Sequence, residues 1–304
     1  MAINLKNKIA GIDFKNPVMG ASGTFGYGQL FEGFYPVSLL GGFVTKGLSL
    51  RPKEGNKTPR VCETAGGMLN AIGLQNIGVE RFIKDMAPAL AKKDVAVIAN
   101  FFGDTVEEFA QLAARLDEAK GVDGLEMNIS CPNRNENGMI FGANIKTTAE
   151  VTRACRQATT KPLIVKLSPN VGDIAEFAKA CEDNGADGLS VINTISGMAI
   201  DIGARKPVLA NVMGGLSGPA IKPVAIRMVW QCYKAVKIPI FGIGGIASAE
   251  DIAEFLLAGA SAVQVGSMNF VEPDICRKLV EKLPGLISSL GASDYRELIG
   301  AAHD

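Results

Sequence analysis

A cysteine stands directly after an apolar run in the segment GLEMNISCPN, which covers residues 124–133. Pro132 ends any strand that this run forms, because proline has no backbone N–H for a sheet and biases the preceding residue towards an extended or turn conformation. Cys131 is therefore expected at the exit of a strand. Once deprotonated, its thiol is able to take a proton from a substrate. The sequence has a single histidine, His303, near its last residue, so proton transfer is expected to fall to another residue type.

Polar residues also end other apolar runs. Lys46 closes the run GFVTK and Lys166 lies within PLIVKL, where burying an unpaired ammonium group is unfavourable. Taken singly, such a lysine could be solvated, and asparagine after a strand is common in turns. Taken together, the set indicates a site that a bound anion or an electron-rich ring completes. Its members are Ser22, Lys46, Asn100, Asn128, Lys166, Asn193, Gly244, Gly245, Gly266 and Ser267.

The segment GIGGIA at 242–247 matches the dinucleotide-binding pattern G-x-G-x-x-A. That pattern requires an acidic residue about 20 residues later, and the corresponding run AVQVGSMNF contains none. We interpret the glycines instead as part of a phosphate site, formed by backbone N–H groups that follow two neighbouring strands. A phosphate site, two lysines, three amides and a cysteine match FMN, with Lys166 stabilising the negative charge that a reduced flavin ring carries.

Eight apolar runs, each bounded by Gly, Pro or Asn, are too short for helices and are typical of strands buried on both faces. They are PVMGA from 17, GFVTK from 42, VAVIAN from 95, GLEMNI from 124, PLIVKL from 162, GLSVIN from 188, IPIFGI from 238 and AVQVGS from 262. Helical patterns separate most of them. The sequence therefore predicts one (β/α)8 TIM barrel over residues 1–304, with INLKNKIAGIDF as an N-terminal β-hairpin closing the bottom. An open doubly wound sheet is the alternative. In a barrel, all the polar residues named above meet at one end.

Local signals mark where several helices begin and end. Thr105, Thr147 and Ser248 each precede an acidic residue by three positions, which is the spacing of an N-terminal capping box. Glycines at 121, 185 and 259 are expected to end three helices.

Composition narrows the classes of function. The chain has 31 Lys and Arg against 31 Asp and Glu, so its charge gives no case for binding nucleic acid or an anionic membrane. No apolar stretch is long enough to span a bilayer and the first residues lack a signal-peptide core, which indicates a soluble cytoplasmic protein. The six cysteines are scattered without a Cys-x-x-Cys pair, so we expect no metal site and no iron–sulfur cluster in this chain.

The residues at the strand ends resemble those of the dihydroorotate dehydrogenase family. The similar blocks are VTKGLSLRPKEGN at 44–56, NAIGLQN at 70–76, NISCPN at 128–133, VKLSPN at 165–170, INTISG at 192–197 and GIGGI at 242–246. The resemblance covers nearly the whole chain. It implies an FMN-containing barrel that oxidises (S)-dihydroorotate to orotate in pyrimidine (UMP) biosynthesis.

The resemblance also implies residue roles. Cys131 corresponds to the catalytic base, which takes the C5 proton while FMN takes the C6 hydride from the opposite face. Substrate-binding positions are Lys46, Asn70, Ala71, Ile72, Gly73, Leu74, Asn128, Asn193 and Thr194. Positions for FMN are Ser22, Lys46, Gly47, Asn100, Asn128, Lys166, Ile192, Gly218, Gly244, Gly245, Gly266 and Ser267.

The segment 197–223 resembles the subtype whose catalytic subunit forms a homodimer within a heterotetramer. Its partner is an electron-transfer subunit that carries FAD and an iron–sulfur cluster and passes electrons to NAD+. The alternatives are a fumarate-linked dihydroorotate dehydrogenase and a dihydropyrimidine dehydrogenase-like flavoenzyme. From other classes, a flavin-free aldolase or isomerase could use Lys46 or Lys166 as a Schiff-base amine, and a phosphate-binding barrel could lack catalysis altogether.

Overall fold

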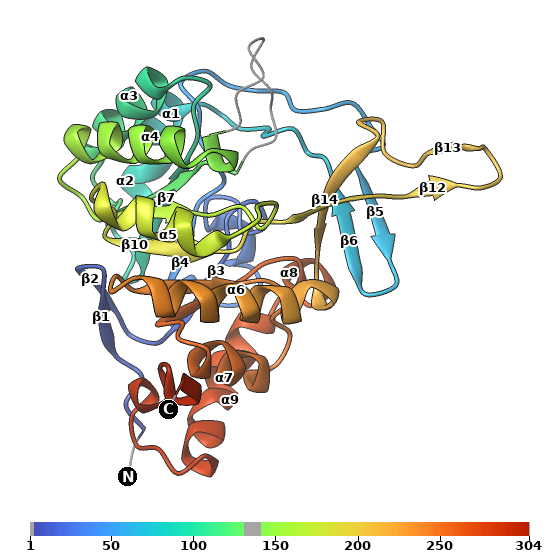
Figure 1. Cartoon of the computed structure of the whole chain (residues 1–304). Coiled ribbons are helices and arrows are strands. Elements are labelled where there is room, and N and C mark those ends of the chain that lie inside the picture. Colours follow the sequence, from blue (N-terminus) through green and yellow to red (C-terminus); the bar gives the residue numbers. More distant parts are fainter. Residues whose placement is uncertain (1–2, 131–140, 304) are drawn as a thin grey trace.

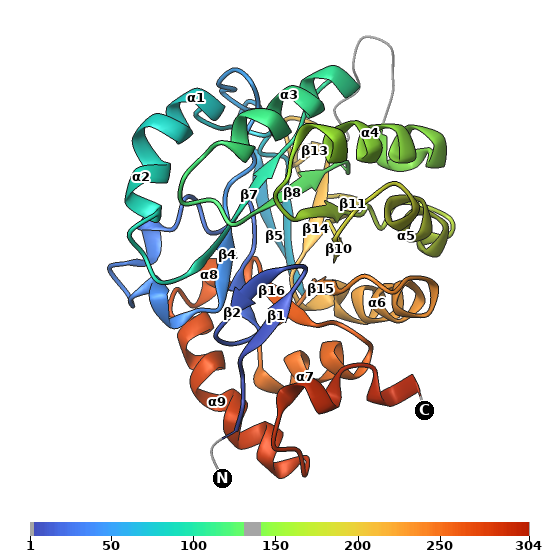
Figure 2. The same cartoon turned by 90° about the vertical axis from the view of Figure 1, so that its left-hand side faces the viewer.

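Eight parallel strands pair in chain order and close into a barrel in the computed structural model, which describes residues 3–130 and 141–303 (Figures 1 and 2). The strands are β3 (Val18–Gly20), β4 (Gly42–Val44), β7 (Ala96–Phe101), β8 (Gly124–Asn128), β9 (Leu163–Lys166), β10 (Gly188–Val191), β15 (Ile240–Ile243) and β16 (Ala262–Val265). β16 pairs with β3 and completes the closure. Each strand coincides with one of the eight apolar runs, β7 extending one residue beyond its run to Phe101, so the predicted barrel is confirmed.

Helices surround the barrel between successive strands (Figure 2). They are α1 (Val79–Arg81) and α2 (Ala87–Leu90), joined by the π-helical turn η3 (Phe82–Met86), then α3 (Val106–Asp117), α4 (Ile145–Ala158), α5 (Ile174–Asp183), α6 (Lys222–Ala235), α7 (Ala249–Leu257), α8 (Met268–Val271) and α9 (Ile275–Ser289). Short 3-10 turns are η1 (Gln29–Phe31), η2 (Val37–Leu39), η4 (Phe141–Ala143), η5 (Pro219–Ile221), η6 (Tyr295–Leu298) and η7 (Ala301–His303). Within the described ranges, none of the helices is long and apolar enough to cross a membrane.

The helix boundaries follow the local signals with one correction. Thr105 caps α3, and Ser248 and Asp251 form a reciprocal capping box at α7. The predicted start at Thr147 is wrong, because Asn144 caps α4 and accepts hydrogen bonds from the N–H groups of Lys146 and Thr147. Asparagine is at least as good an N-cap as threonine, so the earlier residue begins the helix. The three glycines expected to end helices have positive φ angles: Gly121, Gly185 and Gly259.

An N-terminal hairpin covers one end of the barrel, as predicted. Its strands β1 (Asn7–Ile9) and β2 (Ile12–Phe14) are antiparallel. Ile9, Ile12 and Phe14 are buried in one cluster with barrel side chains that include Met19, Ile98, Ile164 and Phe241. A Cβ on Gly124, the first residue of β8, would lie 2.6 Å from the Ile12 side chain. The hairpin therefore closes the amino ends of the strands, and their carboxyl ends form the opposite face.

A second sheet was not predicted from the sequence. Strands β5 (Val61–Thr64), β6 (Gly67–Asn70), β11 (Ile195–Met198) and β14 (Met213–Ser217) form an antiparallel sheet in the order β11-β14-β6-β5. A two-stranded ribbon of β12 (Ile200–Asp201) and β13 (Lys206–Pro207) extends from it. Figure 1 shows this sheet on the side of the barrel away from β1 and β2. It brings the segment after β4 against the segment after β10.

Asp117, the last residue of α3, fixes the segment that leads into β9. Its Oδ1 accepts hydrogen bonds from Thr159 Oγ1 at 2.6 Å and from the backbone N–H groups of Thr160 and Lys161 at 2.7 and 3.0 Å. Burial raises the pKa of Asp117, but these hydrogen bonds outweigh it and lower the pKa to about 2. This carboxylate therefore helps to fix the position of β9, the strand that carries Lys166.

We expect Asp117→Ala to lower the free energy of unfolding by about 1–2 kcal/mol near neutral pH, the scale of hydrogen bonds to a partly exposed carboxylate. A depressed folded-state pKa stabilises above the unfolded value of about 3.9, and this stabilisation is lost as pH falls through the folded value of about 2. Urea unfolding of both proteins near neutral pH and near pH 3 measures the difference. An equal deficit at both pH values would contradict the assignment.

Candidate active site

A buried polar network fills the barrel near the carboxyl ends of its strands. Glu126 on β8 is fully buried. Its Oε1 accepts a hydrogen bond from Asn100 Nδ2 at 2.7 Å, and its Oε2 accepts from Ser190 Oγ at 2.6 Å and Gln264 Nε2 at 2.9 Å. Glu126, Ser190 and Gln264 were not identified from the sequence. The sequence could have indicated them, since each is the one polar residue in the middle of an apolar strand.

Four residues expected to hold FMN lie directly on this network. Lys166 Nζ donates to Ser22 Oγ at 3.1 Å and lies 3.9 Å from Glu126 Oε1. Asn100 Nδ2 lies 3.5 Å from the same Ser22 hydroxyl. A Cβ on Gly47 would come within 2.7 Å of Asn100 Oδ1, so a glycine is needed there. The structure thus brings Ser22, Gly47, Asn100 and Lys166 together.

The amides expected to bind substrate form a second group. Asn193 Nδ2 donates to Asn128 Oδ1 at 3.2 Å. Gly215 in β14 pairs with Asn70, and a Cβ there would lie 2.1 Å from the Thr194 hydroxyl. Asn70 and Thr194 therefore both lie next to Gly215. The antiparallel sheet, which the sequence did not predict, brings them together.

The segment 70–74, expected to line the substrate, is held by Asn56. The Asn56 side chain donates to the Ala71 carbonyl at 2.9 Å, and its backbone N–H donates to the Ile72 carbonyl at 3.0 Å. Gly73 and Leu74 both have positive φ angles. This conformation keeps the segment close to the loop that follows β4.

Lys46 is half-buried and lacks an anionic partner. Within the described part of the chain its ammonium group makes no hydrogen bond or ion pair. Burial lowers the pKa of Lys46, and the nearby positive charge of Arg60 lowers it further. A negatively charged ligand at this point would offset both effects.

The glycines assigned to phosphate binding gather at the ends of the last two barrel strands. Gly244 and Gly245 have φ angles of 134° and 75°, and a Cβ on Gly245 would lie 2.9 Å from the Gly218 carbonyl oxygen. Ile192 joins them, because its N–H donates to the Ile243 carbonyl at 3.1 Å. The following backbone N–H groups donate to nothing within residues 3–130 and 141–303: Gly244, Gly245, Gly266 and Ser267. Unpaired backbone donors of this kind are available to an anion.

The start of α7 is a poor place for a phosphate. Asp251 in its first turn accepts hydrogen bonds from the N–H groups of Ala247 and Ser248 at 2.8 Å each. These two donors are already used by the carboxylate, which also forms an ion pair of 2.6 Å with Lys222. An anion is therefore better held by the glycine loops than by the helix, unlike in a dinucleotide-binding motif.

Cys131 lies outside the described residues, but the residues on either side of its segment are well placed. Ser130 Oγ donates to the Lys166 carbonyl at 3.0 Å, and the Gly142 N–H donates to the Ile129 carbonyl at 2.9 Å. Ser130 and Gly142, on either side of the segment, therefore both lie at the carboxyl end of β8.

The other five cysteines have no role at this site. Cys62 is half-buried, and Cys155, Cys181, Cys232 and Cys276 are buried. Burial raises the pKa of the Cys155 and Cys181 thiols to about 12, so they stay protonated and unreactive near neutral pH. In the ranges that the structure describes, no three His, Cys, Asp or Glu side chains are grouped to hold a metal ion.

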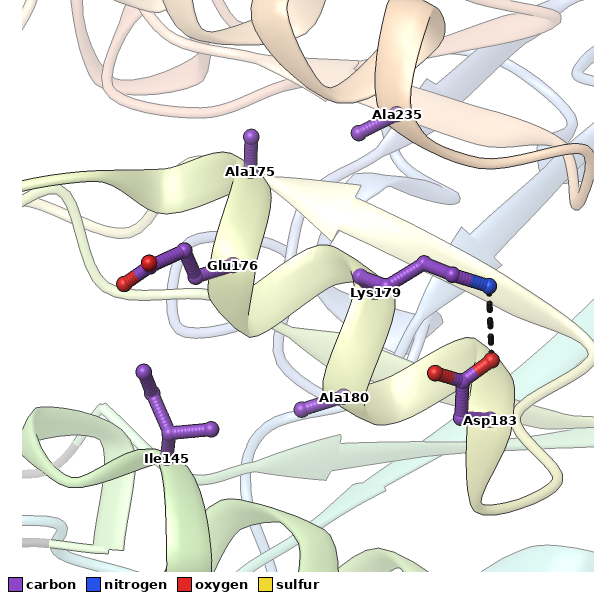
Figure 3. Close-up of a pocket in the computed structure, with 7 residues that line it drawn as sticks. All are labelled: Ile145, Ala175, Glu176, Lys179, Ala180, Asp183 and Ala235. Atoms are coloured by element: carbon purple, nitrogen blue, oxygen red, sulfur yellow. Dashed lines mark hydrogen bonds and ion pairs between the residues drawn. The ribbon is translucent and has the colours of Figure 1, made fainter.

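A separate pocket lies on the outside of the barrel, between α4, α5 and α6 (Figure 3). Its lining includes Ile145, Glu176 and an ion pair of 2.6 Å between Lys179 and Asp183. None of the predicted site residues lines it. Its charged groups are solvated or already paired, so we assign it no chemistry.

Comparison with known proteins gives one consistent result. The family model described as dihydroorotate dehydrogenase matches residues 4–287. A protein of Pelobacter propionicus named dihydroorotate dehydrogenase B (NAD(+)), catalytic subunit, is 56% identical over 99% of this chain and 98% of its own length. Proteins of the same name are 57% identical in Trichlorobacter lovleyi, over 97% of both chains, and 55% identical in Desulforamulus reducens, over the full length of both. The chain belongs to the dihydroorotate dehydrogenase family.

Proposed function

We propose that this chain is the catalytic subunit of an NAD+-linked dihydroorotate dehydrogenase, and that all 304 residues form one FMN-binding domain. It would oxidise (S)-dihydroorotate to orotate in the cytoplasm, as a step of de novo pyrimidine biosynthesis. The observation that supports this proposal most directly is the set of donor groups at the mouth of the barrel, the end where the carboxyl ends of the strands meet. A buried cation and amides lie beside unpaired backbone donors, which is the donor set that a phosphate-bearing flavin requires.

The residues present fit FMN. The unpaired N–H groups of the two glycine loops would hold the phosphate, and the space in front of Gly266 is open, with only the Ala21 side chain at 3.9 Å from a Cβ built there. Lys166 and Asn100 would hold the ring, where the ammonium group supplies positive charge. When bound, FMN supplies the acceptor for the hydride from C6 of the substrate.

The substrate would bind to the amide group formed by Asn70, Asn128, Asn193 and Thr194. Orotate and dihydroorotate carry a carboxylate, and among the described residues neither Lys46 nor the nearby Arg60 forms an ion pair. We assign Lys46 to the charge of the substrate or of the flavin on this basis. The segment 70–74 would shape the pocket around the ring.

Cys131 would take the proton from C5. This proposal is supported by Ser130, the residue before it, whose hydroxyl donates to the Lys166 carbonyl at the carboxyl end of the barrel.

A partner subunit would complete the enzyme. The relatives named above are called catalytic subunits, which supports a second protein in the complex. We propose that this protein carries FAD and an iron–sulfur cluster, passes electrons to NAD+, and binds a homodimer of the present chain to form a heterotetramer.

Substitution of Gly266 tests the phosphate site. A Cβ at 266 meets only the Ala21 side chain, at 3.9 Å, so we expect Gly266→Val to fold normally and to purify with little or no FMN. Gly244→Val is a weaker test, because its φ of 134° and a contact of 2.8 Å to the Ala225 side chain would disturb the packing of α6 as well.

The flavin content per chain and the thermal midpoint are the measurements. Gly285→Val, at an exposed glycine of α9 with open space around it, is the matched control and should retain FMN. A fully yellow Gly266→Val protein would show that the phosphate lies elsewhere.

A further inference from the structure

Glu126 is the most completely buried carboxylate in the described part of the chain. An isolated carboxylate in a barrel interior is strongly destabilising, so it persists only where donors and a cation compensate it. Three side chains donate hydrogen bonds to it, from Asn100, Ser190 and Gln264. Lys166 is the one cation within 4.0 Å of it among the described residues, and it is itself almost fully buried.

The network has two levels that correspond to alternate strands. Glu126, Ser190 and Gln264 come from β8, β10 and β16, the fourth, sixth and eighth barrel strands in chain order. Lys166, Asn100 and Ser22 come from β9, β7 and the end of β3, the fifth, third and first. Side chains of alternate strands form successive layers inside such barrels. Glu126 therefore belongs to the layer that supports the residues at the mouth.

The carboxylate also sets the orientation of two amides. An ionised carboxylate only accepts hydrogen bonds, so each amide must turn its NH2 group towards it. Gln264 does this although its Oε1 is then buried with no partner among the described residues. Asn100 does the same, and its Oδ1 is turned towards Gly47 at the mouth. The charge of Glu126 thus determines which atom of Asn100 faces the ligand.

We infer that Glu126 is a positioning residue for the flavin site, which fixes the Lys166 ammonium group and the Asn100 amide in place. This inference rests on the proposed function, since it assumes that the ring lies against Lys166 and Asn100. Glu126 is assigned no contact with the flavin or the substrate. It acts through its ion pair with Lys166 at 3.9 Å and its hydrogen bond of 2.7 Å to Asn100.

The test is a double-mutant cycle on the full-length chain with Glu126→Gln, Lys166→Met and the double variant. Glutamine keeps the size of the side chain and removes the charge. Alone, each substitution leaves one buried charge without its partner, whereas the double variant leaves none. We therefore expect Glu126→Gln to lower the thermal midpoint of the FMN-free chain in the wild-type background, and to raise it in the Lys166→Met background.

FMN affinity is the second readout, measured by titrating the FMN-free chain and following flavin fluorescence. We expect Glu126→Gln to weaken binding by about tenfold, the scale of one lost charged interaction, and to cause little further loss once Lys166 is methionine. Asp187→Asn is the matched control. It breaks the ion pair of 2.6 Å with Arg156 at the amino end of β10, away from the mouth, and should cost stability while FMN affinity stays within about twofold.

The two readouts separate failure of this inference from failure of the proposed function. Wild-type protein that does not bind FMN would refute the flavin site, while the reversal in thermal midpoint would still report the ion pair. If Glu126→Gln binds FMN as tightly as wild type, Glu126 is not a positioning residue for the flavin. Equal weakening with and without Lys166 would contradict the part of the inference that concerns Lys166.

Discussion

Cys131→Ala protein is expected to retain FMN and to be reduced by dihydroorotate about 10²-fold or more slowly than wild type, the usual scale of a lost general base. The residues proposed to hold FMN lie on the barrel strands and the loops that follow them, and Cys131 is not among them. Four of the other five cysteines offer no substitute, because they are buried and burial raises the pKa of their thiols. Stopped-flow absorbance of the flavin under anaerobic conditions measures the rate.

The pH dependence gives a second readout of the same assignment. A thiol must lose its proton to act as a base, so wild-type reduction should accelerate with pH towards the ordinary cysteine pKa of about 8.5. Cys131→Ser should show a slower rate without this rise in the same range. Cys62→Ser, at a half-buried cysteine on β5, is the control and should behave as wild type. Near-normal kinetics in Cys131→Ala would remove this residue from the mechanism.

The second large effect concerns the electron acceptor. We expect the isolated chain to oxidise dihydroorotate rapidly with an artificial dye and to reduce NAD+ very slowly until a partner subunit is added. The physical reason is that its one dinucleotide-like segment, 242–247, lies beside the unpaired donors assigned to phosphate and leads into a helix whose start carries Asp251. The N–H donors that a pyrophosphate would need at this helix start are already bonded to Asp251.

Parallel assays with the dye, fumarate and NAD+ measure the acceptor preference of the chain alone. The relatives that are named NAD(+) catalytic subunits favour the two-subunit arrangement. Rapid NAD+ reduction by the chain alone would rule out the need for a partner. Rapid fumarate reduction would place the chain in the single-subunit, fumarate-linked subtype.

The barrel was predictable because its strands are buried on both faces. Such strands are continuous apolar runs that end at Gly, Pro or Asn, and all eight were located before the structure was known. The antiparallel sheet was not, because its strands are glycine-rich or half-exposed, as in MGGLS at 213–217. Its stability comes from pairing between segments about 145 positions apart, such as Asn70 with Gly215, and no local pattern reports this.

The candidate site, like the fold, was predictable from the sequence only in part. Lys166 could be assigned from its place in an apolar strand, since a buried ammonium group is unfavourable unless a partner or ligand compensates it. Its counter-ion could not, because Glu126 faces inward on the neighbouring strand and its other partners, Ser190 and Gln264, come from strands far along the chain. A single acidic residue in an apolar run indicates a buried carboxylate, but only the closed barrel shows which side chains it contacts.

Anaerobic mixing of the purified chain with dihydroorotate tests the central claim most directly. We predict a yellow protein whose flavin absorbance bleaches on mixing, with one orotate formed for each FMN reduced. Uracil and dihydrouracil should neither bind tightly nor change the flavin spectrum, since they lack the carboxylate that Lys46 and its surroundings are suited to meet. A colourless protein would leave only flavin-free functions for this barrel, and a flavin that responds to dihydrouracil but not to dihydroorotate would make the chain a dihydropyrimidine dehydrogenase-like enzyme.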